Sequence, residues 1–509
     1  MDVTQILMLI TILVYLAAMV GIGAVLAKQN QTTDDFYLGG RTLGPLVTAM
    51  SAEASDMSSW LLMGLPGVAY LSGTADAAWT AIGLAIGTYV NWLVVAKRLR
   101  NYTHVCGNST TLPLFFSNRY RDNKRILSVI AALLIIIFFV PYTASGFAAC
   151  GKLFANLFGM DYLPAMLISA IVIVAYTTLG GFLAASTTDF VQSIVMTIAI
   201  VVVFGFGISK VGSFSAVMDN AKSMAGYFSL THTHDVATGT ASPYSLLQIF
   251  STLAWGLGYF GMPHVLLRFM AIGDANKLKL SRRVATVWVV ISMAVSVFIG
   301  VIGNAMTKAG VLPTLKDPET IILVVADLIS KHGVLATIIA GLILAGILAA
   351  TMSTADSQLL AASSSASQNI LKEVFMKDMS EKTGMLIARI TVLVIALIGV
   401  FIARNPDSSV FQIVSFAWAG FGASFGPLVL LALFWKRSTF QGALCGMVSG
   451  GVMVFVWKFL IRPMGGALCI YELLPAFLLG LAVNVIVSLL TPAPSREVQD
   501  EFDKVASMK

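Results

Sequence analysis

Charge is scarce in this sequence. Only 11% of its 509 residues are charged, whereas 57% are hydrophobic, and the mean hydropathy is +0.86. A soluble domain carries about 25% charged residues to cover its surface. The shortage excludes a soluble fold and predicts an all-α polytopic membrane protein surrounded by a lipid bilayer. The net charge of +7 is expected to mark basic loops beside the membrane, and nucleic acid is not an expected partner.

Cysteine-based sites are also missing. The four cysteines form no CxxC pair and no zinc-ligand spacing, so they are expected to fill apolar space. No HExxH motif occurs either, and we expect a protein that is not an enzyme. The first basic residue is Lys28, so the basic segment of a secretory signal is absent and the first apolar run is expected to remain a helix. Nothing in the sequence indicates a separate soluble domain or an obligate protein partner.

Apolar runs long enough to cross a membrane recur along the chain. A spanning helix needs about 20 apolar residues. Thirteen windows are predicted to span, at 6–26, 43–71, 77–96, 127–157, 163–179, 190–209, 246–270, 284–307, 335–370, 385–403, 409–435, 441–461 and 471–491. The polar stretches at 97–125 and 210–245 are expected to be loops within a single membrane unit, residues 1–509.

The basic residues are distributed unevenly between the two sides of these windows. If the N-terminus lies outside, the inner loops hold 22 of the 32 Lys and Arg residues and the outer loops hold nine. Cytoplasmic loops of membrane proteins carry such an excess. We therefore expect a multi-pass protein of the plasma (inner) membrane with its N-terminus outside and a cytoplasmic tail at 492–509.

Two of the windows are interrupted. Window 43–71 contains SAEASDMSS, and window 246–270 contains WGLGYFGMP, with three glycines and a proline. Glycine and proline weaken a helix, and a membrane tolerates this where backbone lines a cavity or is buried in protein. Broken helices at matching places in two halves of a chain indicate a transporter's midplane site. Because the interruptions are five windows apart, we expect an inverted five-plus-five repeat with halves 43–209 and 246–435. An extra helix and loop at 1–42 and two extra helices at 441–491 complete the chain.

Asp56 lies in the first interruption. A charge at membrane depth costs at least ~2.5–3.5 kcal/mol, so such residues face the protein interior and usually have a function. Two roles remain open for this carboxylate. It couples transport to a cation, directly or by organising the site, or it caps amides that the broken helix leaves free.

Small polar residues form a second cluster in window 335–370. Ala350, Ser353 and Thr354 have i, i+3, i+4 spacing and share one helical face. Hydroxyls together with carbonyls freed by an unwound helix suit a monovalent hard cation, whereas calcium usually takes several carboxylates. The alternative is close packing of helices through small residues. Asp356 and Ser357 lie on the same face as Ser353, and Asp189 immediately precedes window 190–209. These residues either build a second cation site or cap helices at the inner surface.

Aromatic residues lie at or beside the apparent breaks. These residues are Trp60, Tyr142, Trp255 and Tyr259. Aromatic residues at span ends usually form interfacial belts, but a position beside a break favours a binding pocket. His264 and Arg268 follow the second break, and we expect them to anchor the inner end of that helix.

Several long motifs, in order, resemble the sodium:solute symporter family. They are YLGGRTLGP (37–45), ASDMSSWLLMGLPG (54–67), FFVPYTASG (138–146), WGLGYFGMPH (255–264), MST (352–354) and SFAWAGFGASFGP (415–427). The resemblance covers almost the whole chain. It implies a LeuT-type fold with 13 transmembrane helices. Members that carry proline are the most similar, so the implied activity is uptake of L-proline with sodium ions by alternating access.

The resemblance also implies roles for single residues. The main sodium site would use backbone oxygens of Ala54, Met57 and Ala350 with the hydroxyls of Ser353 and Thr354. Asp56 and Ser58 match positions important for coupled uptake, and Asp189 matches an acidic residue near the inner sodium pathway. The implied substrate pocket comprises Ser58, Trp60, Tyr142, Trp255, Tyr259 and Pro263.

Two residues depart from the pattern of the proline carriers. Ser59 stands where a glycine is expected, which bears on substrate affinity. Asp356 stands where a serine is expected, and its carboxylate would strengthen a second sodium site. Other substrates within the family are the main alternative, either another amino acid or a small carboxylate such as pantothenate. A membrane-embedded sensor with the same fold is a third possibility, disfavoured because only about 18 residues follow the last window.

Overall fold

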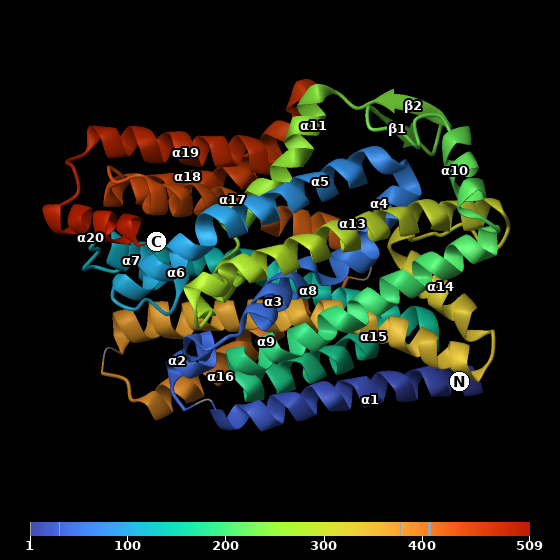
Figure 1. Ribbon diagram of the computed structural model, residues 1–509, viewed down its shortest axis with the longest axis horizontal. Helices are drawn as coiled ribbons and strands as arrows, with labels where there is room; N and C mark the ends of the chain where they lie inside the picture. The colour runs from blue at the N-terminus through green and yellow to red at the C-terminus, as the bar shows by residue number, and fades with distance from the viewer. Residues whose placement is uncertain (1, 30, 377, 406–408, 509) are drawn as a thin grey trace.

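The computed structural model describes residues 2–29, 31–376, 378–405 and 409–508. In these residues the secondary structure is helical except for one antiparallel hairpin, β1 (His232–Asp235) with β2 (Thr240–Pro243). The long helices run alongside one another as a bundle, and the hairpin lies at one end of it (Figure 1). Helices satisfy every backbone polar group internally, which lipid demands. The expected helical architecture is confirmed.

Ten helical stretches in the described residues are long and apolar enough to cross a membrane. They contain the helices α1 (Val3–Leu26), α5 (Thr74–Val90) with α6 (Ala96–Val105), α8 (Ile126–Phe158), the second part of α9 (Tyr162–Val211), α13 (Leu278–Lys308), α15 (Val334–Ser364), α16 (Glu381–Ile402), α17 (Val410–Phe434), α18 (Phe440–Val456) and α19 (Leu473–Leu490). The remaining three windows, 43–71, 163–179 and 246–270, are also helical but are interrupted or shorter. The count of thirteen spans therefore stays a prediction.

The first interrupted window forms α3 (Pro45–Ser59), a π-helical turn at Trp60–Gly64, and α4 (Leu65–Ser72). Its break is at Ser58, whose φ of 48° and ψ of −171° are not helical. A positive φ is strained for a residue with a side chain, and it persists where the surroundings hold it. Here the Ser58 hydroxyl oxygen accepts a hydrogen bond from the Trp60 amide at 3.0 Å. The interruption that the sequence predicted is present.

The second interrupted window forms α11 (Leu246–Leu253), a 3₁₀ segment at Ala254–Phe260, and α12 (Pro263–Ala271). The glycines of this segment permit close packing. A Cβ atom on Gly258 would lie 2.0 Å from Nε1 of Trp418 on α17. Pro263 occupies the first turn of α12, where its missing N–H is harmless.

The two interrupted windows lie against each other. The Leu43 amide donates to the Ala271 carbonyl at 3.2 Å, and the Gly273 amide donates to the Leu43 carbonyl at 3.0 Å. These bonds join the start of α3 to the end of α12. The contact brings together two segments more than 200 residues apart, as paired broken helices require.

Helix α9 contains the fifth and sixth predicted windows. It changes direction at Gly181, where φ is 61° and ψ is −163°. Glycine adopts this conformation without a steric penalty. Two windows that the sequence separates are thus joined by a single non-helical residue, and Asp189 follows the break by two turns of helix.

The segment after α19 folds back onto the bundle as α20 (Arg496–Ser507). It lies beside α6 and α7 (Leu112–Arg119), at the end of the bundle opposite the hairpin (Figure 1). Its apolar face, Val498, Phe502 and Val505, is buried. The Phe502 ring packs between two guanidinium groups, 4.8 Å from Arg98 and 5.5 Å from Arg119. Ion pairs from Arg121 to Glu497 and Glu501 and from Lys436 to Asp503 hold its polar face.

Phe502→Ala should release α20 from the bundle. Burying a phenylalanine side chain stabilises by about 1.5–3 kcal/mol, which corresponds to roughly 10- to 100-fold in the local opening equilibrium. Hydrogen exchange of the amides of residues 496–507 should accelerate by that factor, while exchange in α8 stays unchanged. Lys504→Ala, on the exposed face of the same helix, serves as the control. Equal exchange in both variants and the parent would contradict the docking.

Candidate functional site

The break in α3 meets α15 through oxygen atoms. The Ser353 hydroxyl lies 2.8 Å from the Ala54 carbonyl and 3.1 Å from the Ala350 carbonyl. The Thr354 hydroxyl lies 3.1 Å from the same Ala350 carbonyl. All four residues are buried. The structure thus brings together four of the five residues predicted for the main sodium site, and each of the two hydroxyls lies within hydrogen-bond distance of at least one of the two carbonyls.

Met57 completes the predicted set differently. It is buried, and its carbonyl accepts a hydrogen bond from the Trp60 amide just beyond the break. It therefore lies three residues after Ala54 on α3, but among the described residues no hydrogen bond joins its carbonyl to the hydroxyl of Ser353 or Thr354.

Asp56 connects the two interrupted helices. Its Oδ2 atom accepts a hydrogen bond of 2.5 Å from the Tyr259 hydroxyl of the second break. Its backbone carbonyl accepts one of 3.3 Å from the Tyr142 hydroxyl on α8. The side chain is 6% exposed. Asp56 therefore joins α3, α8 and the 3₁₀ segment of the second window. These bonds reach other helices, whereas capping would involve only the amides of its own broken helix.

The predicted aromatic residues surround this break. Trp60 and Trp255 are buried with ring centroids 5.6 Å apart, and Phe411 of α17 packs 5.9 Å from Trp60 and 5.6 Å from Trp255. Tyr259 makes an edge contact with Trp418 at 5.0 Å. These rings come from the two interrupted windows and from α17. They favour a pocket wall over an interfacial belt, because belt residues face lipid headgroups.

A small cavity lies beside the break. Its volume is about 10 Å³, and its lining includes Ser58, Ser59, Tyr142 and Thr354. Such a volume holds about one water molecule. The site is therefore closed in this conformation, and a larger occupant requires movement of the surrounding helices.

A buried ion pair between Arg268 and Asp189 joins four helices. Arg268 of α12 and Asp189 of α9 lie 3.1 Å apart and are at most 1% exposed. The Ser51 hydroxyl of α3 donates to Asp189 at 2.6 Å, and Nε of Arg268 donates to Ser51 at 3.0 Å. Arg268 also donates to the Ser357 hydroxyl of α15 at 2.5 Å. Removing one partner of such a buried pair strongly destabilises the folded protein, because the remaining charge is left buried without a counter-charge.

This network corrects the expected role of Arg268. The sequence pattern predicted inner-end anchoring, whereas the side chain lies fully inside the protein. Arg268 lies within α12, five residues after Pro263. The signal available in the sequence was its apolar surroundings, VLLRFMA, in which an isolated arginine needs a partner.

Asp356 and Ser357 belong to the same region. Both are buried on α15, and the Ser357 hydroxyl lies 2.9 Å from the Ser353 carbonyl and 3.0 Å from the Asp356 carboxylate. Ser357 therefore links the Ser353–Thr354 oxygens to the Arg268–Asp189 pair. The two predicted roles, a second cation site and helix capping, both stay predictions.

One sequence pattern that suggests a hydrolase carries no such chemistry. Residues 422–426, GASFG, match the GxSxG pattern of a nucleophilic serine. That motif works on a sharp turn between strand and helix. Here it lies inside α17, with Ser424 buried.

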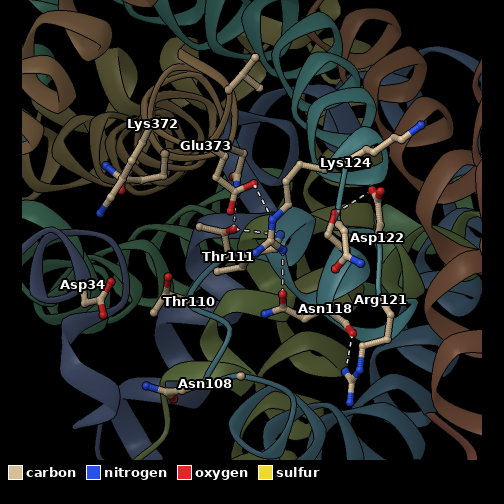
Figure 2. Close-up of a pocket in the computed structure, with 18 of the residues that line it drawn as sticks. Asp34, Asn108, Thr110, Thr111, Asn118, Arg121, Asp122, Lys124, Lys372 and Glu373 are labelled. Carbon is tan, nitrogen blue, oxygen red and sulfur yellow. Dashed lines mark hydrogen bonds and ion pairs between the residues drawn. The ribbon is translucent and has the colours of Figure 1, made fainter. Parts of the chain in front are cut away.

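A much larger cavity lies elsewhere. It measures about 1340 Å³ and is lined by polar residues of the α6–α8 region, by the residues after α15 and by Glu501 of α20. Figure 2 shows charged side chains of both signs around it, among them Asp34, Arg121, Lys372 and Glu373. None of the predicted site residues lines it. It is a wide polar mouth at the α20 end of the bundle and not the site itself.

Comparison with known proteins extends over nearly the whole chain. The sodium:solute symporter family profile matches residues 36–450. The chain is 41% identical over 502 residues to the sodium/proline symporter of Salmonella typhimurium, covering 98% of this chain and 96% of the relative. It is 42% identical over 482 residues to the high-affinity proline transporter PutP of Bacillus subtilis, covering 95% and 98%. It is 40% identical to the osmoregulated proline transporter OpuE of Bacillus subtilis, covering 96% of each.

Solved structures agree on the fold. The substrate-bound, outward-open structure of a Na⁺-coupled sialic acid symporter superposes with a TM-score of 0.79 at 19% identity, covering 96% of this chain and 99% of that one. A nucleobase-cation-symport-1 family transporter in a closed conformation superposes with a TM-score of 0.50 at 14% identity, covering 92% and 98%. Broken helices packed against each other, a membrane-spanning bundle and these matches lead to one conclusion: the chain belongs to the sodium:solute symporter family.

Proposed function

We propose that this protein takes up L-proline together with sodium ions by alternating access. The observation that carries the proposal is the shared use of one distorted segment, Ala54 to Ser58. Its Ala54 carbonyl faces the α15 hydroxyls, and its Asp56 side chain is bonded to Tyr259 of the aromatic cluster. An ion and a substrate bound on the two sides of this segment would hold the same backbone in place.

Sodium is the ion that this site suits. Ala54, Met57 and Ala350 would offer carbonyl oxygens, and Ser353 and Thr354 would offer hydroxyls. This set supplies hard oxygen ligands without a full negative charge, which fits a monovalent cation. Asp189, Asp356 and Ser357 are candidates for a second sodium site or for coupling, and Arg268 already neutralises one of the two carboxylates.

Proline suits the aromatic side of the break. Its ring is a compact apolar body for the faces of Trp60, Trp255 and Tyr259, and its cationic amine gains from the same π surfaces. Ser58, Tyr142 and Pro263 complete the proposed pocket. The broken helix would present a half-helix terminus to the substrate carboxylate, as in transporters with discontinuous spans. The names of the three bacterial relatives support proline as the substrate.

The proposed topology has 13 spans in a LeuT-type five-plus-five inverted repeat, with the N-terminus outside and α20 in the cytoplasm. The distribution of basic residues supports this orientation. The wide polar cavity beside α20 would then open towards the cytoplasm. Its mixed charges and amides suit the passage of a hydrated ion and a zwitterion.

Sealed vesicles that contain the purified protein test the function directly. An inward sodium gradient of tenfold with a potential of ~100 mV supplies about 1.4 plus 2.3 kcal/mol per sodium ion. If one sodium accompanies each proline, accumulation can approach about 500-fold, because zwitterionic proline does no work against the potential. Accumulation of labelled proline should disappear when potassium replaces sodium. Sodium-driven uptake of pantothenate or another amino acid, without proline uptake, would assign a different substrate; accumulation driven by a proton gradient alone would overturn sodium coupling.

The Ser353→Ala, Thr354→Ala double variant tests the ion site. Removing both hydroxyls should raise the sodium concentration for half-maximal uptake, at saturating proline, by tenfold or more, since two of the proposed five ligands are lost. Thr354→Ser keeps the hydroxyl and should behave like the parent. Ser364→Ala is a matched control on the same helix, because its buried hydroxyl bonds the Ala361 carbonyl of its own turn. Unchanged sodium dependence in the double variant would move the ion towards Asp189 and Asp356.

A further inference from the structure

The helix pair that follows the proposed repeats reaches into the aromatic cluster. Tyr471, just before α19, packs on Trp255 with ring centroids 5.0 Å apart and ring planes 22° from parallel. Among the rings that contact Trp255 this is the most nearly parallel and the closest. Trp60 and Phe411 also pack against Trp255, each with a ring-centroid distance of 5.6 Å. Trp255 therefore contacts both rings of the proposed pocket and a ring from outside the repeats.

Tyr471 is itself fixed by hydrogen bonds to two other helices. Its amide donates to the Ser251 hydroxyl of α11 at 2.7 Å, and its own hydroxyl donates to the Ser415 carbonyl of α17 at 2.7 Å. The residue is 9% exposed. Tyr471 thus joins α11, the first half of α17 and the start of α19 in one place.

The next residue secures this arrangement. Glu472 is fully buried and pairs with Arg462 at 3.0 Å and with Lys458 at 3.6 Å, both in the connection between α18 and α19. A carboxylate with two cationic partners is expensive to move, because separation would leave it buried and unpaired. The backbone that carries Tyr471 is therefore held in place by buried ion pairs, whereas Trp255 lies on a 3₁₀ segment rich in glycine.

We propose that Tyr471 is a positioning residue for substrate binding, acting through the indole of Trp255. The inference rests on the proposed placement of the substrate against Trp255. Tyr471 does not touch the substrate in this arrangement. Its ring holds the indole in the orientation that presents a flat face to the pocket. Two helices that lie outside the repeats thereby contribute to affinity.

Equilibrium binding of labelled proline to the purified protein at saturating sodium tests this role. Tyr471→Leu should raise the Kd about threefold to tenfold, the range of a stacked aromatic pair. Tyr471→Phe keeps the ring and therefore the stacked pair, so its proline Kd should stay within about 1.5-fold of the parent value. Phe459→Leu is a matched control, because this ring lies in the same connection but is 60% exposed.

A double-variant cycle separates positioning from a general structural effect. If Tyr471 acts through Trp255, Tyr471→Leu should add almost nothing once Trp255→Leu is present. Equal losses in the two backgrounds, or parent-like binding by Tyr471→Leu, would overturn the inference while leaving the pocket intact. Parent-like binding by Trp255→Leu would instead remove Trp255 from the pocket, and the inference would fall with that part of the proposed function.

Discussion

The interruption of α3 at Ser58 is the feature on which the rest of the site depends. An unbroken helix uses its carbonyls for its own hydrogen bonds and offers none to a ligand. Because Ser58 has a positive φ, the helix is interrupted one turn after Ala54, inside a buried environment. Ser353 meets it from α15, Tyr142 from α8 and Tyr259 from the second broken window. The strain of one residue is thus supported by contacts from three helices, as strained functional backbone generally is.

A second constraint acts below the break. Arg268 and Asp189 are buried as a pair, and Ser51 and Ser357 bind the same group of charges from α3 and α15. Each of the four residues comes from a different helix, so relative movement of these helices must break or rearrange charge-assisted bonds. Such bonds are stronger than neutral ones. The network therefore stabilises the observed packing of α3, α9, α12 and α15 against one another.

The sequence predicted the helical architecture, both interruptions and the common helical face of Ala350, Ser353 and Thr354, because each rests on a local pattern. The meeting of Ala54 with Ser353 was implied by the family resemblance and not by a local pattern. Glycine, proline and polar residues inside apolar windows are visible without coordinates, as is i, i+4 spacing. What could not be predicted depends on the packing of distant segments. The partners of Arg268, the stacking of Tyr471 on Trp255 and the docking of α20 join residues between 79 and about 400 positions apart. The course of α9 through the non-helical Gly181 was not predicted either. A glycine between two apolar windows does not reveal whether the chain turns there or continues as helix.

The central claim is that sodium and proline stabilise the same backbone between Ala54 and Ser58. Coupling of this kind is reciprocal: the factor by which sodium tightens proline binding must equal the factor by which proline tightens sodium binding. The most direct measurement is equilibrium proline binding to the purified protein over a range of sodium concentrations, with potassium keeping the ionic strength constant, together with sodium binding with and without proline. The account predicts a proline Kd that falls as sodium rises and equal coupling factors in the two directions. A proline Kd that is independent of sodium would contradict it.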